Sequence, residues 1–112
     1  MIRAVKVKDL VDQLGLEVVS GIFDKDISGV YVGDLLSNAM AKAQADNLWI
    51  TIQGHQNVVA VASLTDLAAV IVVENFEIEA ASVKRAEEKE VNILRTPLTA
   101  YELSRKLIEL GL

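Results

Sequence analysis

The stretch "LWITIQGHQNVVAVASLTDLAAVIVVENFEIEAASVKRAEEKEVNILR", residues 48–95, alternates short apolar runs with longer segments of helical character. It predicts strands at "LWITIQ", "AAVIVV" and "VNILR", because each is a short apolar run bounded by polar residues. The strand centres Ile50, Ile71 and Ile93 follow one another at intervals of about 20 residues, the spacing that a right-handed strand-helix-strand unit of short elements requires. The stretch therefore predicts a parallel sheet.

The helices between these strands are expected at residues 57–66 and 80–89. The segments "AAVIVV" and "NVVAVASL" are apolar on nearly all sides, as expected for a central strand covered on both faces and a helix pressed against it. The segment "SVKRAEEKE" instead carries a strongly charged face, which belongs on the outside. We therefore predict an α/β fold, a three-layer sandwich whose mainly parallel central sheet is flanked by helices.

The regions on either side of this stretch add further elements. Residues 7–14 predict a helix, because apolar residues recur there at helical spacing, and Gly15 is suited to end it. The segments "LEVVS" and "VYV" are expected to be extended, and a final helix is expected at residues 98–110, ended by Gly111. Asp34 is expected to cap a helix that presents five residues to the core: Leu35, Leu36, Ala39, Met40 and Ala43.

Composition limits both the architecture and the class of partner. The chain has 112 residues, a size typical of one domain, so residues 1–112 are predicted to form a single domain. Apolar residues make up 52% and aromatic residues only 4%, so the core must consist mostly of Val, Ile, Leu and Ala. The formal net charge of -5 argues against nucleic acid as a partner, because binding to phosphate backbones depends on clustered Lys and Arg.

Neither a membrane nor a metal is expected as a partner. The longest apolar runs, residues 58–62 and 67–73, are shorter than the roughly 20 residues that cross a bilayer. The N-terminal residues "MIRAVKVKDLVDQLG" lack the continuous apolar segment of a secretory signal, which favours a cytoplasmic location. The absence of Cys and the single His exclude a disulfide framework and a multi-histidine metal site. No cofactor is expected.

Polar tips follow the three predicted strands, namely "QGHQN", "ENFEIE" and "RTPLT". In parallel α/β sheets, ligands usually bind outside the carboxyl ends of the strands, near helix N-termini that carry a partial positive charge. The tips supply a glycine for close backbone approach, several hydrogen-bonding side chains, and an arginine suited to a phosphate or carboxylate. The candidate ligand-binding residues are Gly54, His55, Gln56, Asn57, Glu74, Asn75, Arg95 and Thr96.

Each tip also has a purely architectural interpretation. Gly54 can serve only to turn the chain, with Asn57 capping the next helix and His55 in solvent. The acidic residues of the second tip are expected before a helix because of its dipole, although carboxylates also suit a hard cation or acid–base chemistry. At the third tip, Thr96 or Thr99 can cap the last helix.

The usual catalytic motifs are absent from the chain. The sequence contains no GxxxxGK[ST] phosphate loop, no GxGxxG, no GxSxG elbow and no HExxH. Phosphoryl transfer from ATP, dinucleotide redox chemistry and the common hydrolases therefore lack their sequence signatures. We assign no catalytic residue from the sequence.

Three segments, "SGIFDKDISGVYVGDLLSNAM", "WITIQGHQNVVAVASLTDLAAVIVVEN" and "VNILRTPLTAYELSRKL", resemble the DRTGG domain, over nearly the whole chain. Domains of that family are found fused to CBS-containing pyrophosphatases and to phosphate acetyltransferases. Their fold is similar to the N-terminal domain of HPr kinase/phosphorylase, which lacks that enzyme's catalytic phosphate loop. The resemblance implies a regulatory or assembly module, commonly dimeric, that is not a catalyst.

The chain departs from the family pattern at the residues that give the family its name. His55-Gln56 stand where the family tends to place Asp-Arg, and Val73-Glu74-Asn75 stand where it tends to place Thr-Gly-Gly. The resemblance therefore carries no ligand site onto these positions. We expect a divergent, stand-alone member of the family.

Three functional hypotheses are compatible with these observations. The first is a non-catalytic, homodimeric module that modulates a partner enzyme or signalling protein, with the aliphatic residues of "GVYVGDLLSNAM" either in a dimer contact or in the core. The second is a sensor of a nucleotide or another small anionic metabolite, held by Gly54, His55, Gln56 and Arg95. The third is a small enzyme that uses His55 and Glu74 as an acid–base pair.

Overall fold

The structure of the chain is a computed structural model that describes residues 5–112. The first four residues of the predicted domain lie outside this described part. The elements, in chain order, are β1 (Val5–Lys6), α1 (Val7–Leu14), β2 (Glu17–Ser20), β3 (Asp26–Ile27), β4 (Gly29–Val32), α2 (Leu36–Lys42), β5 (Asn47–Thr51), α3 (Gln56–Leu64), β6 (Ala69–Val72), α4 (Ala80–Lys89), β7 (Ile93–Arg95) and α5 (Ala100–Glu109).

The centre of the fold is a five-stranded sheet with the strand order β2-β7-β6-β5-β4. Strands β4, β5, β6 and β7 are parallel, and the register places Ile50 of β5 opposite Ile71 of β6, which in turn lies opposite Leu94 of β7. β2 joins one edge antiparallel to β7, and β1 and β3 form a separate antiparallel pair. The α/β class and the mainly parallel sheet are therefore confirmed, with one antiparallel edge strand that makes the sheet mixed.

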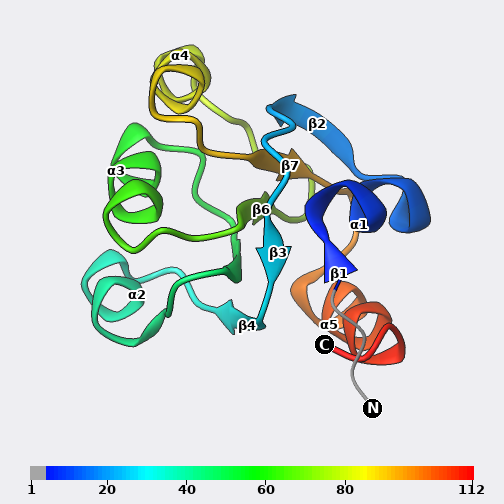
Figure 1. Ribbon diagram of the computed structural model, residues 1–112. Coiled ribbons are helices and arrows are strands. Elements are labelled where there is room, and N and C mark those ends of the chain that lie inside the picture. The colour runs from blue at the N-terminus through cyan, green and yellow to red at the C-terminus, as the bar shows by residue number, and fades with distance from the viewer. Residues whose placement is uncertain (1–4) are drawn as a thin grey trace.

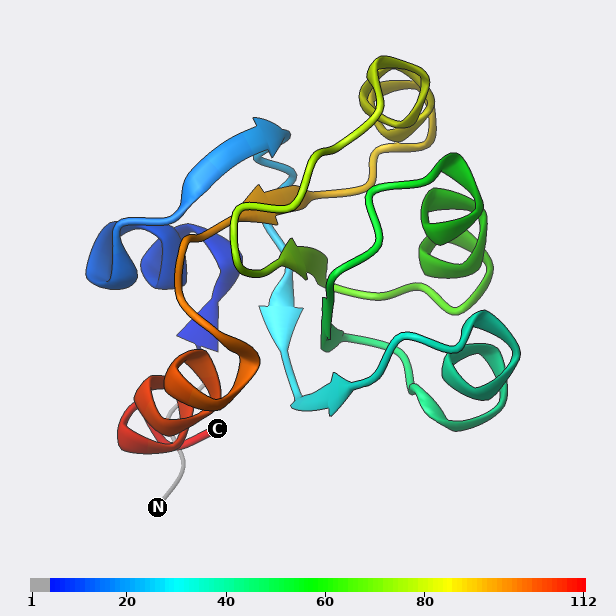
Figure 2. The ribbon, with the colours of Figure 1, turned by 180° about the vertical axis from the view of Figure 1, so that it is seen from behind.

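Helices cover both faces of the sheet, as Figures 1 and 2 show from opposite sides. α2, α3 and α4 pack on one face, while α1, α5 and the small β1–β3 sheet pack on the other. This is the predicted three-layer sandwich. No helix within residues 5–112 is long and apolar enough to cross a membrane.

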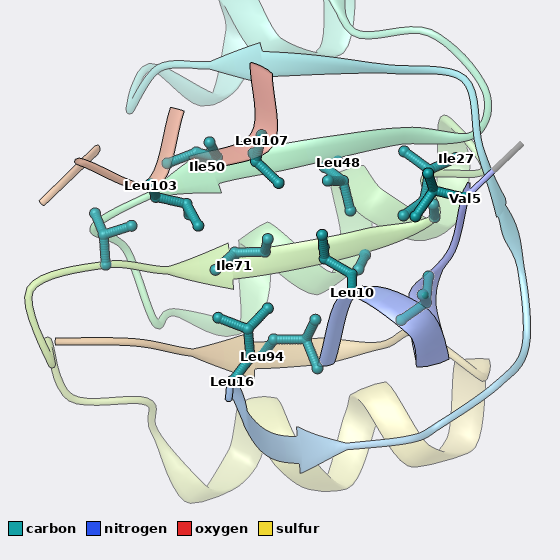
Figure 3. Packing of buried hydrophobic residues seen from close by; sticks show 14 residues of the cluster. Val5, Leu10, Leu16, Ile27, Leu48, Ile50, Ile71, Leu94, Leu103 and Leu107 are labelled. Carbon is teal, nitrogen blue, oxygen red and sulfur yellow. The ribbon is translucent and has the colours of Figure 1, made fainter. Parts of the chain in front are cut away.

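The strand β5 contributes side chains to both cores, because successive residues of a strand point to opposite faces. Leu48 and Ile50 are fully buried in the same cluster as Leu10 of α1 (Figure 3). Trp49 is fully buried in the cluster on the other face, and its indole N–H donates to the Gly33 carbonyl at 2.8 Å. A fully buried aliphatic side chain such as Leu48 or Ile50 contributes about 1.5–3 kcal/mol to stability. Burial on both faces explains why the central strands are almost continuously apolar.

Several helix boundaries agree with the sequence pattern. α1 and α4 have the predicted bounds, and Gly15 ends α1 in a left-handed conformation with φ 62°. The helix predicted at residues 57–66 spans Gln56–Leu64, and its N-cap is His55 rather than Asn57. The cap assignment was wrong because the imidazole, like a short polar side chain, can accept a hydrogen bond from the helix start.

The region around α2 differs from the prediction. Asp34 does not cap this helix, because the N-cap position is occupied by Leu35 and has no side-chain hydrogen bond. Ala39 is buried as predicted, whereas Leu35 and Met40 are 66% and 49% exposed. α2 has only seven residues and lies at the end of its layer, beyond α3 (Figure 1), so only a narrow stripe of the helix contacts the core.

The start of α5 is held by two reciprocal hydrogen bonds. The Glu102 N–H donates to Thr99 Oγ1 at 3.1 Å, and the Thr99 N–H donates to Glu102 Oε1 at 3.0 Å. Such a capping box satisfies two of the N–H groups that a helix start leaves unpaired. The hydrogen bond from the Thr99 backbone holds the pKa of Glu102 below its usual value.

This cap predicts a pH-dependent difference between the wild-type protein and Glu102→Gln. A carboxyl whose pKa is lowered in the folded state stabilises the fold above its unfolded pKa, and this stabilisation is lost as pH falls through the folded pKa. We expect the wild-type protein to be the more stable at neutral pH and to lose that advantage in acid, as measured by urea unfolding across the acid range. The exposed α4 residue Glu88, changed to Gln, is the control. A wild-type advantage that is independent of pH would contradict the prediction.

Candidate functional site

An open hollow of about 620 Å³ lies outside the carboxyl end of β5. Its walls come from the first turn of α2, the end of β5, the first turn of α3 and residues 73–79, which connect β6 to α4. We call this cavity the β5 hollow and this connection the β6–α4 segment. The residues that line the hollow are Leu36, Ile52, Gln53, Gly54, His55, Asn57, Phe76, Glu77 and Glu79.

His55 presents its Nε2 atom close to a carboxylate. Its Nδ1 accepts a hydrogen bond from the Asn57 N–H at 3.1 Å, which places the proton of the neutral ring on Nε2. Nε2 lies 3.9 Å from Oε1 of Glu79, and both side chains are about half exposed, at 49% and 53%. The two atoms are too far apart for a direct hydrogen bond. The hollow therefore contains a donor and an acceptor side by side that do not satisfy each other.

Gly54 brings two backbone segments into close contact. Its carbonyl accepts hydrogen bonds from the Glu79 N–H at 3.1 Å and from Ser82 Oγ at 2.7 Å. A Cβ atom at this position would lie 2.6 Å from Cα of Ile78 and would collide with the carbonyl oxygen of Glu77. Only glycine fits while the β6–α4 segment keeps this path.

The other end of the β6–α4 segment is attached to the chain that follows β7. The Glu74 N–H donates to the Leu98 carbonyl at 2.9 Å, and the Asn75 N–H donates to the Thr96 carbonyl at 3.0 Å. Glu74 and Asn75 both have left-handed backbones, with φ values of 57° and 53°. The segment thus crosses the carboxyl edge of the sheet from β7 to β5, and neither Glu74 nor Asn75 lines the hollow.

Asp34 connects the β4–α2 turn to the end of β5. Its Oδ1 accepts hydrogen bonds from Thr51 Oγ1 at 2.8 Å and from the Ile52 N–H at 2.9 Å. The Asp34 carbonyl accepts a third bond from Nε2 of Gln53. These contacts position Ile52 and Gln53 in the wall of the hollow. Their partners are distant in sequence, so the local pattern could identify Asp34 only as a helix cap.

Only part of the predicted candidate set meets at the hollow. Gly54, His55 and Asn57 line it, and Gln56 lies beside them as the first residue of α3, exposed but outside the lining. Three of the four candidate residues of the first tip therefore line the cavity. Whether these residues bind a ligand stays a prediction.

The third tip follows β7, away from the hollow at the end of β5. Arg95 Nε donates to Glu17 Oε1 of β2 at 3.0 Å, which forms an ion pair between the two strands. Thr96 is buried, and its hydroxyl accepts a hydrogen bond from the Leu98 N–H at 3.3 Å. Because β6 separates β7 from β5, Arg95 does not converge with Gly54 as the ligand-sensor hypothesis expected.

The remaining residues that line the hollow are not among the candidates predicted from the sequence. Leu36, Ile52 and Phe76 form the apolar part of the wall, and nothing in the local sequence distinguishes them from core residues. Glu77 and Glu79 belong to the acidic residues of the second tip, but they were not among the candidates. They flank Ile78, which packs against the core, and alternation in an extended segment therefore directs both carboxylates away from the core.

The lining favours binding by hydrogen bonds and apolar contacts. It contains the carboxylates of Glu77 and Glu79 and no Lys or Arg. The carboxylate that approaches His55 belongs to Glu79 and not to Glu74, so the acid–base pair of the enzyme hypothesis is not formed. Within residues 5–112, no group of three or more His, Asp and Glu side chains is arranged to hold a metal ion.

Comparisons with known proteins agree with this architecture. The family model of the DRTGG domain matches residues 9–110. No curated protein matches the chain. Among solved structures, the fold is similar to that of the CBS and DRTGG domains of the regulatory region of Clostridium perfringens pyrophosphatase, complexed with its activator diadenosine tetraphosphate. That likeness has a TM-score of 0.69 at 14% identity and covers 88% of this chain but only 44% of the other, so this chain spans less than half of that structure.

The close approach at Gly54 predicts that Gly54→Ala displaces the β6–α4 segment. We expect the free energy of unfolding to fall by about 1–3 kcal/mol, as is usual when a methyl group is forced into a packed contact, measured by urea unfolding. Amide NMR signals should shift along residues 77–79. Gly29→Ala is the matched control, because its methyl group would meet only the flexible side chain of Asn47, at 3.1 Å from Nδ2. Equal effects of the two substitutions would contradict the prediction.

Proposed function

The chain belongs to the DRTGG domain family, and on that basis we propose that it is a non-catalytic regulatory module that acts through another protein. The structurally similar DRTGG domain lies in the regulatory region of a pyrophosphatase, which supports such a role. We also propose that residues 1–112 act as one DRTGG-like domain. That the module modulates a partner enzyme or signalling protein, and that it is cytoplasmic, stay predictions.

The observation that carries this proposal is an exposed aliphatic surface at one edge of the sheet. We call it the β4–α2 surface and define it as Val32, Leu35 and Met40, which are 51%, 66% and 49% exposed. Within residues 5–112, β4 pairs with β5 alone, so its outer side is an open edge. Open edges and exposed apolar side chains favour association with another chain. We propose that a second copy of the chain covers this surface in a homodimer.

Substitutions on the β4–α2 surface test the homodimer. We expect the wild-type protein to have twice the mass of one chain by size-exclusion chromatography with light scattering. The double variant Leu35→Glu, Met40→Glu should raise the dissociation constant at least about tenfold, because two carboxylates would be buried without partners. At concentrations low enough for both proteins to be monomeric, the double variant and the wild-type protein should have nearly the same melting temperature, because both side chains are exposed in one chain.

Ile108→Glu is the matched control for this experiment. Ile108 is 68% exposed on α5, on the opposite face of the sheet. Its substitution should leave the dimer intact. A wild-type protein that is monomeric at every concentration, or a dimer that Ile108→Glu disrupts and the double variant does not, would refute the proposed interface.

A second candidate function is sensing of a small ligand in the β5 hollow. It is supported by the position of the hollow outside the carboxyl end of a parallel strand, where ligands of α/β folds usually bind. The similar pyrophosphatase region was crystallised with a nucleotide activator, so nucleotides are the first ligands to test. An enzyme that uses His55 and Glu74 gains no support, because the two residues do not pair.

Ligand sensing predicts thermal stabilisation by AMP or diadenosine tetraphosphate. A ligand at about 100 times its dissociation constant stabilises the native state by about 2.7 kcal/mol. We therefore expect the melting temperature to rise by several degrees in a thermal-shift experiment. Phe76→Ala should reduce this rise, because Phe76 lines the hollow, whereas Tyr101→Ala should not, because Tyr101 is an exposed aromatic residue on α5. No stabilisation by either nucleotide would count against the sensor.

A further inference from the structure

The charges of the β5 hollow disfavour a phosphate group inside it. The lining carries the carboxylates of Glu77 and Glu79 and contains no Lys or Arg. The nearest candidate cation in the predicted site, Arg95, lies two strands away and is already paired with Glu17. A phosphate placed in the hollow would lie beside two like charges, which is unfavourable without a compensating cation. The ligand group that enters the hollow must therefore be uncharged or a hydrogen-bond donor.

The geometry of His55 and Glu79 suits a hydroxyl group. Their Nε2 and Oε1 atoms are 3.9 Å apart, which is too long for a direct hydrogen bond, but an oxygen atom placed to one side of the pair can lie within hydrogen-bond distance of both. A hydroxyl is both donor and acceptor, so it can accept from Nε2–H and donate to the carboxylate. Glu77 makes no ion pair within residues 5–112 and adds a second carboxylate to the same wall. Glu77 and Glu79 are thus two acceptors on one wall of the hollow, and a ribose offers two hydroxyl donors.

The remaining lining suits a flat ring. Phe76 is 45% exposed and lines the hollow with Leu36 and Ile52, so an aromatic face and two aliphatic side chains are available for stacking and apolar contact. The side-chain amide of Asn57 forms no hydrogen bond within the described chain, and an amide can pair with the donor and acceptor of a purine edge. The cavity thus contains hydrogen-bonding groups suited to the hydroxyls of a diol and an aromatic ring suited to a base.

We propose that the β5 hollow binds the nucleoside end of its ligand, with ribose hydroxyls on Glu79 and Glu77, the purine base against Phe76, and any phosphate in solvent. This inference rests on the proposed ligand-sensing role and specifies its chemistry. It differs from the expectation of an anionic ligand, because the part that is recognised carries no charge.

The test is a calorimetric titration of the full chain with adenosine, guanosine, AMP and tripolyphosphate. At least one nucleoside should bind no more weakly than AMP, and tripolyphosphate should not bind. The 2′,3′-dideoxy form of the nucleoside that binds should bind about tenfold more weakly, because two hydrogen bonds to carboxylates are lost.

Glu79→Gln provides the matching change in the protein. The Glu79 side chain forms no capping hydrogen bond, so the variant should keep the wild-type melting temperature. It should weaken nucleoside binding about tenfold, since an amide accepts a hydroxyl hydrogen bond less strongly than a carboxylate. Glu88→Gln on the outer part of α4 is the control and should leave binding unchanged.

The possible failures are distinguishable. Binding of AMP or tripolyphosphate that is tighter than binding of either nucleoside, or that is unaffected by Glu79→Gln, would overturn the nucleoside inference and leave the sensor proposal standing. Absence of binding by all four probes and by diadenosine tetraphosphate would overturn both. The homodimer proposal is independent of these outcomes, because it depends on residues outside the proposed nucleoside contacts.

Discussion

The close contact between Gly54 and the β6–α4 segment is the constraint on which the candidate site depends. The Gly54 carbonyl binds the start of α4 through Glu79 and Ser82, and the missing side chain lets the backbone of Glu77 and Ile78 approach. This contact, together with the packing of Ile78 against the core, holds the segment beside the β5–α3 turn. The segment supplies the wall of the hollow that carries Phe76 and both carboxylates, while the end of β5 and the first turns of α2 and α3 supply the rest.

The opposite end of the same segment explains an apparent departure from the family. Glu74 and Asn75, which the sequence resemblance sets opposite two glycines of the DRTGG pattern, both adopt the left-handed backbone that glycine favours. Asn tolerates this conformation readily, whereas Glu does so at a cost of about 1–2 kcal/mol. The two hydrogen bonds to the chain after β7 compensate for that cost. Glu74 and Asn75 can therefore hold a backbone conformation that glycine would adopt at lower cost.

The hollow and the β4–α2 surface share one structural element. Leu36 at the start of α2 lines the hollow, while Leu35, the preceding residue, lies on the exposed surface. Asp34 joins both to the end of β5 through Thr51 and the Ile52 N–H. A ligand in the hollow and a second chain on the surface would thus contact adjacent residues of one turn. Coupling between two sites requires such a shared element, and this turn is where a regulatory module of this fold can supply it.

The spacing of apolar residues was sufficient to predict the three-layer fold, because this spacing reports burial directly. The bounds of α1 and α4 agree with the prediction, and Ile50, Ile71 and Ile93 lie in parallel strands. The sequence also placed the β5–α3 turn among the candidate ligand-binding tips. Which of the tips contribute to one cavity became clear from the three-dimensional arrangement alone. The path of the β6–α4 segment across the sheet depends on long-range backbone hydrogen bonds, and these leave no periodic signal in the residues that make them.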